Sequence, residues 1–198
     1  MSGRAYTQTR RADATAQTRR AILDAAQHLF REERELDPSL DQVAARAGCS
    51  TRSIIRHFGS KQGLMEAAVA DATATIGESR LVEPGDPEAA VTRLVEHYEQ
   101  LGDEVIRWLG SAERYPLVRR VVETGTEMHH QWVDAVFAPQ LDACAAAERR
   151  ELRASLATVT DVQVWHLLRR REGLGRKAVE AAILQLVRAA LENPKGER

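Results

Sequence analysis

The chain has 198 residues, of which 43% are hydrophobic and 29% are charged, as in an ordinary folded protein. This length allows one or two domains with a substantial core, and the composition excludes global disorder. Only 12 glycines, 6 prolines and 5% aromatic residues are present. That scarcity disfavours a sandwich of many short strands and favours helices.

Charge is distributed unevenly along the chain, although the formal net charge is only −1. Residues 1–61 contain 11 Lys and Arg against 7 Asp and Glu, whereas the remainder contains 17 against 22. A basic N-terminal third followed by a mildly acidic remainder favours a polyanionic partner for the N-terminal part alone.

Several classes of protein are disfavoured by features that are missing. The first 20 residues are polar and Arg-rich, without the apolar core of a secretory signal, and no apolar run approaches the about 18 residues of a membrane span. Cys49 and Cys144 show no spacing typical of disulfides or zinc ligands. We therefore expect a cytoplasmic protein without cofactor, metal or membrane association.

Apolar residues recur at three- and four-residue steps along most of the chain, which predicts an all-α protein with about nine helices. Residues 1–14 are polar and basic and predict a flexible arm. An N-terminal three-helix unit is expected over residues 15–61, and a larger helical body over 62–198. In that body, short helices at 117–122 and 128–141 are expected to be separated near Gly125, with a bend at Pro139. The last two helices are expected at about 150–171 and 176–192.

Residues 39–57 have the form helix, glycine-containing turn, helix. Ser39 is a candidate N-cap that forms a capping box with Gln42. Gly48 suits the left-handed end of that helix, and Ser50 is the N-cap candidate of the next. This is the pattern of a helix-turn-helix motif, whose second helix enters the major groove of DNA.

Polar and cationic side chains cluster at this motif. Arg52, near the start of the second helix, has the geometry to pair with a guanine edge through two hydrogen bonds. Donors at the flanks of the motif suit phosphate oxygens. The candidate DNA-binding residues are Ser39, Gln42, Thr51, Arg52, Ser53, Arg56, His57 and Lys61.

The segment from Ile22 to Leu64 resembles the N-terminal domain of the TetR family of transcriptional regulators. The matching residues are Ala25-Ala26, Leu29-Phe30, Ser39, Val43-Ala44, Ala47-Gly48, Ser50, Ser53-Ile54, His57-Phe58, Ser60-Lys61 and Leu64. Three positions depart from the family pattern: Arg34 replaces a usual Gly, Pro38 a common Thr, and Ile55 a Tyr that contacts phosphate. The role of that Tyr does not carry over to Ile55.

The resemblance implies a homodimeric regulator, a repressor released from a palindromic operator by a small apolar effector. The candidate effector-binding residues in the body are Tyr98, Trp108, His129, Trp132, Asp161 and Trp165. The last helix pair resembles the family's dimer interface, and the interface candidates there are Val162, Leu167, Val179, Ile183, Leu186 and Val187. Packing inside the core of one protomer is the alternative for both sets of apolar residues.

Two other functional classes are a binding protein without DNA recognition and an enzyme. A helical ligand-binding or interaction protein without DNA binding is the alternative, and Ile55 and the near-neutral net charge favour it slightly. An enzyme is not expected, because the sequence contains no nucleophile elbow, phosphate-binding glycine loop or dinucleotide fingerprint.

Overall fold

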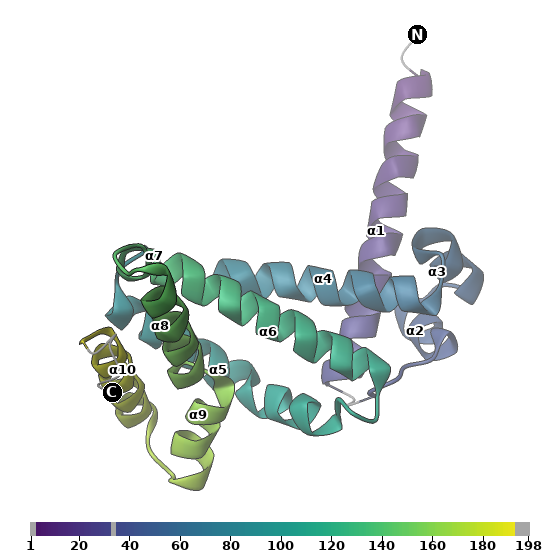
Figure 1. Ribbon diagram of the computed structural model, residues 1–198. Helices are drawn as coiled ribbons and strands as arrows, with labels where there is room; N and C mark the ends of the chain where they lie inside the picture. Colours follow the sequence, from purple (N-terminus) through teal and green to yellow (C-terminus); the bar gives the residue numbers. More distant parts are fainter. Residues whose placement is uncertain (1–2, 33–34, 193–198) are drawn as a thin grey trace. The chain divides into compact units, whose positions relative to one another are not determined.

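The protein is described here from a computed structural model that covers residues 3–32 and 35–192 (Figure 1). Within these ranges all regular structure is helical, which confirms the predicted fold class. The elements are α1 (Gly3–Arg31), α2 (Leu40–Ala47), α3 (Thr51–Phe58), α4 (Lys61–Ser79), α5 (Pro87–Ser111), α6 (Pro116–Val136), α7 (Ala138–Asp142), α8 (Ala146–Val159), α9 (Val162–His166), a π-helical segment (Leu167–Arg171) and α10 (Arg176–Glu192).

The chain divides into two compact units, a first unit of residues 1–74 and a second unit of residues 75–198. The helix α4 contains residues of both units. The expected boundary after residue 61 therefore differs from the division seen in the structure. The reason lies in the first half of α4, where Leu64, Met65 and Ala68 are buried within the first unit.

In the first unit, α2 and α3 pack against the C-terminal half of α1. Ile22 and Leu29 of α1, Val43 of α2 and Ile54 of α3 are buried together with the start of α4. Gln27 fastens α1 to α4, because its side-chain amide donates to the Ala68 carbonyl at 3.0 Å and to the Asp71 carboxylate at 2.9 Å. The three-helix unit is thus completed by a fourth helix.

The N-terminal segment differs from the expected flexible arm of residues 1–14. Gly3 to Ala14 continue α1 without interruption, whereas Met1 and Ser2 lie outside the described residues. After Gly3 the segment contains no glycine or proline to end a helix. This helix could not be predicted from the sequence, because the segment has no apolar stripe of the kind that marks a packed helix.

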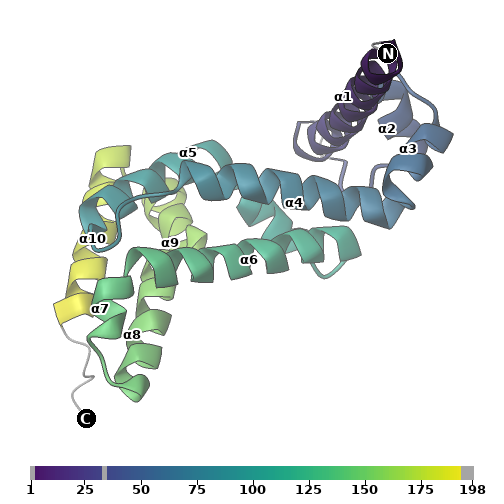
Figure 2. The same cartoon turned by 90° about the horizontal axis from the view of Figure 1, so that it is seen from above.

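In the second unit, α5 packs against α6, α9 and α10, and α8 lies against α6 and α10 (Figure 2). The core consists of buried apolar residues from all of these helices. Its largest fully buried side chains include Leu94 of α5, Phe137 before α7, Leu156 of α8, Trp165 of α9 and Ile183 of α10.

Two predicted segments of the second unit have different boundaries in the structure. The helices expected at 117–122 and 128–141 are mostly one helix, α6, which runs through Gly125 and ends at Val136. Pro139 lies in the first turn of α7, where it needs no amide hydrogen bond. The single helix expected at 150–171 is divided at Thr160, because Asp161 caps the next helix through the amide of Gln163.

None of the helices in the described ranges is both long and apolar enough to cross a membrane.

Candidate functional site

The first helix of the helix-turn-helix motif begins and ends as its sequence predicted. The Gln42 amide donates to Ser39 Oγ at 3.2 Å, and the Ser39 amide donates to Gln42 Oε1 at 2.7 Å, which completes the capping box. Gly48 ends α2 with φ of 64°, in the left-handed region that favours glycine. The capping box leaves the other Gln42 side-chain atoms at the surface, beside the start of α2.

The second helix, α3, is held in place by one buried residue and one cap. Ser50 Oγ accepts a hydrogen bond from the Ser53 amide at 3.2 Å and so fixes the first turn. Ile54 is fully buried and anchors the inner face of α3 to the rest of the first unit. Because the inner face is fixed, the opposite face of α3 has a defined set of outward side chains.

The outward face of α3 is cationic, with one apolar residue. Arg52 and Arg56 are exposed, and Arg56 reaches back to Ser53 Oγ at 3.3 Å. Ile55 is 41% exposed between them, at the position where the family pattern has Tyr. Thr51, Ser53 and His57 are half-buried beside this face. The structure therefore brings together the α3 candidates on one accessible helix.

Lys61, the candidate phosphate contact at the start of α4, forms an ion pair with another residue of the same chain. Its Nζ lies 2.7 Å from Asp37 Oδ1, in the loop that precedes α2. Both side chains are substantially exposed, so solvent screens this pair. Pro38, next to Asp37, is buried, while Arg34, the other loop departure from the family pattern, lies outside the described residues.

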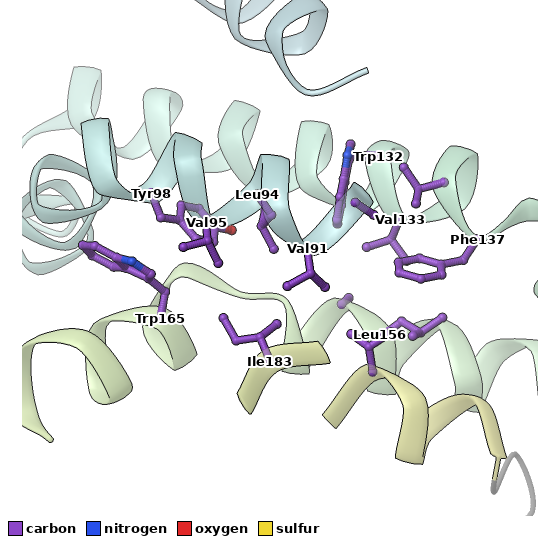
Figure 3. Close-up of a cluster of buried hydrophobic side chains, with 14 of the residues drawn as sticks. Val91, Leu94, Val95, Tyr98, Trp132, Val133, Phe137, Leu156, Trp165 and Ile183 are labelled. Atoms are coloured by element: carbon purple, nitrogen blue, oxygen red, sulfur yellow. The ribbon is translucent and has the colours of Figure 1, made fainter. Parts of the chain in front are cut away.

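Four of the six effector-site candidates lie together in the second unit. Tyr98, His129, Trp132 and Trp165 are all buried. Figure 3 shows Tyr98, Trp132 and Trp165 among side chains from separate helices. The rings of Tyr98 and Trp165 are 6.0 Å apart, and those of His129 and Trp132 are stacked at 5.7 Å. Trp108 is half-buried outside this core cluster, and Asp161 caps α9.

Arg80 connects this aromatic group, although it is not among the site residues predicted from the sequence. Only 3% of Arg80 is exposed, and its guanidinium carbon lies 4.7 Å from the Trp132 ring centroid. Its Nη2 lies 3.3 Å from His129 Nδ1. Burial lowers the pKa of His129 to about 4, and the adjacent Arg80 charge adds to this effect. No local pattern marks Arg80, because its position after α4 resembles that of an exposed helix-end arginine.

Four of the dimer-interface candidates belong to the core of a single protomer. Val162, Val179, Ile183 and Val187 are buried among the other helices of the second unit, so they are not available to a partner. Their helical spacing indicated an apolar face but did not indicate what covers it. Leu167 and Leu186 differ from them, since they are 45% and 42% exposed.

Comparison with known proteins agrees with the geometry of the first unit. A model of the bacterial regulatory proteins of the tetR family matches residues 22–68. Two uncharacterised HTH-type transcriptional regulators of Mycobacterium tuberculosis, from strains CDC 1551 / Oshkosh and ATCC 25618 / H37Rv, are each 30% identical over 95 residues. These matches cover 48% of this chain, and the chain spans about half (46%) of the length of these relatives.

Two solved structures share the fold over nearly the whole chain. A transcriptional regulator from Rhodococcus sp. Rha1 matches with a TM-score of 0.57 at 18% identity, over 90% of this chain and 96% of that one. A candidate transcriptional regulator from Streptomyces coelicolor A3(2) matches with a TM-score of 0.57 at 22% identity, over 86% and 98%. Over residues 22–68, which contain the helix-turn-helix motif, this chain is therefore similar to the bacterial regulatory proteins of the tetR family.

Proposed function

We propose that the protein is a transcriptional regulator that binds double-stranded DNA with α3 in the major groove. The observation that carries this proposal is the division of α3 into two faces. Ile54 is buried on one face, and Arg52, Ile55 and Arg56 are exposed on the other. An exposed arginine at the start of such a helix suits a guanine edge, and an exposed isoleucine suits a thymine methyl group.

The flanks of the motif offer further contacts for the DNA backbone. The amides at the start of α2 lie beside Ser39, and Lys61 lies at the start of α4. Helix N-termini and lysines are common partners of phosphate oxygens. The excess of basic residues over residues 1–61 supports the same partner.

We propose further that the regulator acts as a homodimer on a palindromic operator. We also propose that a small effector binds within the second unit. The protein is then a repressor that leaves its operator when the effector binds. Two observations support assembly through α10. Leu186 is exposed on this helix, and the same helix lines a surface hollow. The hollow is lined by Ala181, Leu184, Gln185, Arg188, Ala189 and Glu192.

Titration of the purified protein with DNA from upstream of its own coding region tests the proposal. Fluorescence anisotropy at several salt concentrations should show binding to one segment that is tighter than binding to scrambled DNA. The affinity should fall steeply with salt, because phosphate contacts release counterions. Equal, weak binding to both DNAs would favour the alternative, a helical ligand-binding protein without DNA recognition.

A further inference from the structure

Arg80 is buried in the second unit, and it differs from three partly buried arginines there that form ion pairs. Arg153 pairs with Asp134, Arg169 with Glu99, and Arg170 with Asp103. Arg80 is more deeply buried than any of these, yet it forms no ion pair with a carboxylate among the side chains that the structure describes. A buried charge without a counter-charge is strongly unfavourable in a protein interior.

The groups around Arg80 cannot supply the missing negative charge. The rings of Trp132 and Tyr98 lie 4.7 Å and 5.9 Å from its guanidinium carbon, and their aromatic faces attract it weakly. The Tyr98 side chain also hydrogen-bonds Arg80, but burial raises the pKa of Tyr98, so its hydroxyl carries no charge. His129 is neutral near pH 7, because burial and the Arg80 charge lower its pKa to about 4. A neutral imidazole accepts a hydrogen bond from Arg80 but does not balance its charge.

The hydrogen bonds of the cluster are complete except at one edge of the guanidinium. His129 Nε2 lies 3.1 Å from the Ala157 carbonyl, which assigns the ring proton to Nε2 and leaves Nδ1 as the acceptor for Arg80 Nη2. The Tyr98 hydroxyl donates to the Thr160 carbonyl, and the Trp132 indole donates to the Arg80 carbonyl. Arg80 Nε alone is buried within this group without a hydrogen-bond partner.

We propose that Arg80 binds the carboxylate of a small organic acid, which lies along the Nε edge between the faces of Trp132 and Tyr98. The planar guanidinium edge matches a planar carboxylate through two parallel hydrogen bonds. The surrounding apolar side chains of α5 and α6 suit an apolar body. The ligand is therefore a monocarboxylate with an alkyl or aromatic body.

Binding at this place requires a change in the protein. Arg80, His129 and Trp132 are each less than a tenth exposed, so an entering ligand must displace the side chains that now cover the guanidinium. A ligand that binds only the opened cluster shifts the protein toward that conformation. The inference rests on the proposed function only where it treats this acid as the effector; binding of the acid itself is independent of DNA.

The experiment compares each acid with its neutral amide on the wild-type protein. The two pairs of probes are decanoate with decanamide and 4-phenylbutyrate with 4-phenylbutyramide. Binding of each probe is measured by thermal unfolding and by tryptophan fluorescence. At least one acid should raise the melting temperature and bind about tenfold or more tightly than its amide, because only the acid meets the charge of Arg80. Equal effects of acid and amide, including no effect of either, would overturn the proposal.

Variants assign the effect to Arg80. Arg80→Met should lose the preference for acid over amide and should be at least as stable as wild type without ligand, since it removes an unpaired buried charge. Arg80→Lys keeps the charge without the two-donor edge and should weaken acid binding about tenfold. Arg153→Met, a control at a paired arginine of the same unit, should keep wild-type acid binding. Unchanged acid binding by both Arg80 variants would overturn the assignment.

The same samples separate this inference from the proposed function. Each protein is also titrated with upstream DNA in the absence of acid. DNA binding without any preference for acids overturns the inference alone. Acid binding that depends on Arg80 in a protein that fails to bind DNA overturns the proposed regulator and leaves the carboxylate site standing.

Discussion

Gly102 of α5 lies directly against the indole ring of Trp165 of α9: a Cβ atom on residue 102 would lie 2.3 Å from Trp165 Cζ3. The ring has little freedom to move away. Its Nε1 donates to Glu99 Oε1 at 3.0 Å, and the Arg170 guanidinium covers its other face at 5.0 Å from the centroid. The contact between α5 and α9 therefore depends on the missing side chain at residue 102.

Replacing Gly102 with Ala should destabilise the protein by about 1–3 kcal/mol, the usual cost of overpacking a fixed core. Gly110→Ala is the matched control in the same helix, because nothing lies within 4 Å of a Cβ at that position. The control should stabilise by about 0.5–1 kcal/mol through helix propensity. Urea unfolding followed by circular dichroism measures both, and similar values for the two variants would contradict the packing argument.

Arg52→Ala should weaken binding to the operator by about 1–3 kcal/mol and relax the preference at one base pair, if its guanidinium reads a guanine edge. Binding to scrambled DNA should change much less. Arg93→Ala, an exposed arginine of the second unit that pairs with Glu96, should leave both affinities unchanged. Equal losses on operator and scrambled DNA would show that Arg52 contacts phosphate instead.

The ion pair between Lys61 and Asp37 predicts opposite effects of two substitutions on DNA affinity. Lys61→Gln should weaken binding to every sequence and reduce the salt slope by about one. Asp37→Asn should strengthen binding, because it frees the lysine and removes a negative charge at the proposed DNA surface. Each change should alter stability by about 1 kcal/mol or less, as for other exposed pairs. Anisotropy across a salt series distinguishes these effects from loss of folding.

The buried His129 predicts that stability falls in mild acid. Its pKa is lowered to about 4 in the folded protein, against about 6.5 in the unfolded chain, so the unfolded state takes up the proton first. The His129 contribution is therefore fully present above about pH 6.5 and decreases as the pH falls toward 4, by about 2–3 kcal/mol. Burial and the Arg80 charge disfavour the charged ring, and they outweigh the Ala157 carbonyl and the Asp161 carboxylate, which favour it.

His129→Gln should remove most of this dependence on pH, although it should lower stability at neutral pH. His130→Gln is the control on the neighbouring, half-buried residue, and it should keep the wild-type profile. Urea midpoints between pH 4 and 7.5 measure the effect. A wild-type slope that persists in His129→Gln would assign the acid sensitivity to other groups.

Leu186→Glu should convert the protein from a dimer to a monomer at micromolar concentration, because it places a charge on the exposed face of α10. Leu81→Glu is the matched control, since Leu81 is also an exposed leucine of the second unit, at 74%. Sedimentation velocity measures the mass of each variant. A wild-type monomer would refute the proposed assembly, and a dimer that survives Leu186→Glu would place the interface elsewhere.

The sequence by itself determined α2 and α3 of the first unit and the pattern of its motif. Ser39, Gln42, Gly48 and Ser50 act through their own backbone neighbours, so the ends of α2 and α3 could be predicted from residues a few positions apart. The apolar spacing that buries Ile54 likewise fixed which face of α3 points outward. These are local relationships, and a single sequence contains them.

Only the tertiary structure decided which apolar faces are covered and where the buried charge lies. Val179 and Leu186 look equivalent as apolar positions on α10, yet one packs inside the protomer and the other faces outward. Arg80 and His129 are 49 positions apart, and their contact depends on how the end of α4 meets α6. Such contacts form only when segments that are distant in the sequence pack together. The spacing of neighbouring residues therefore does not predict them.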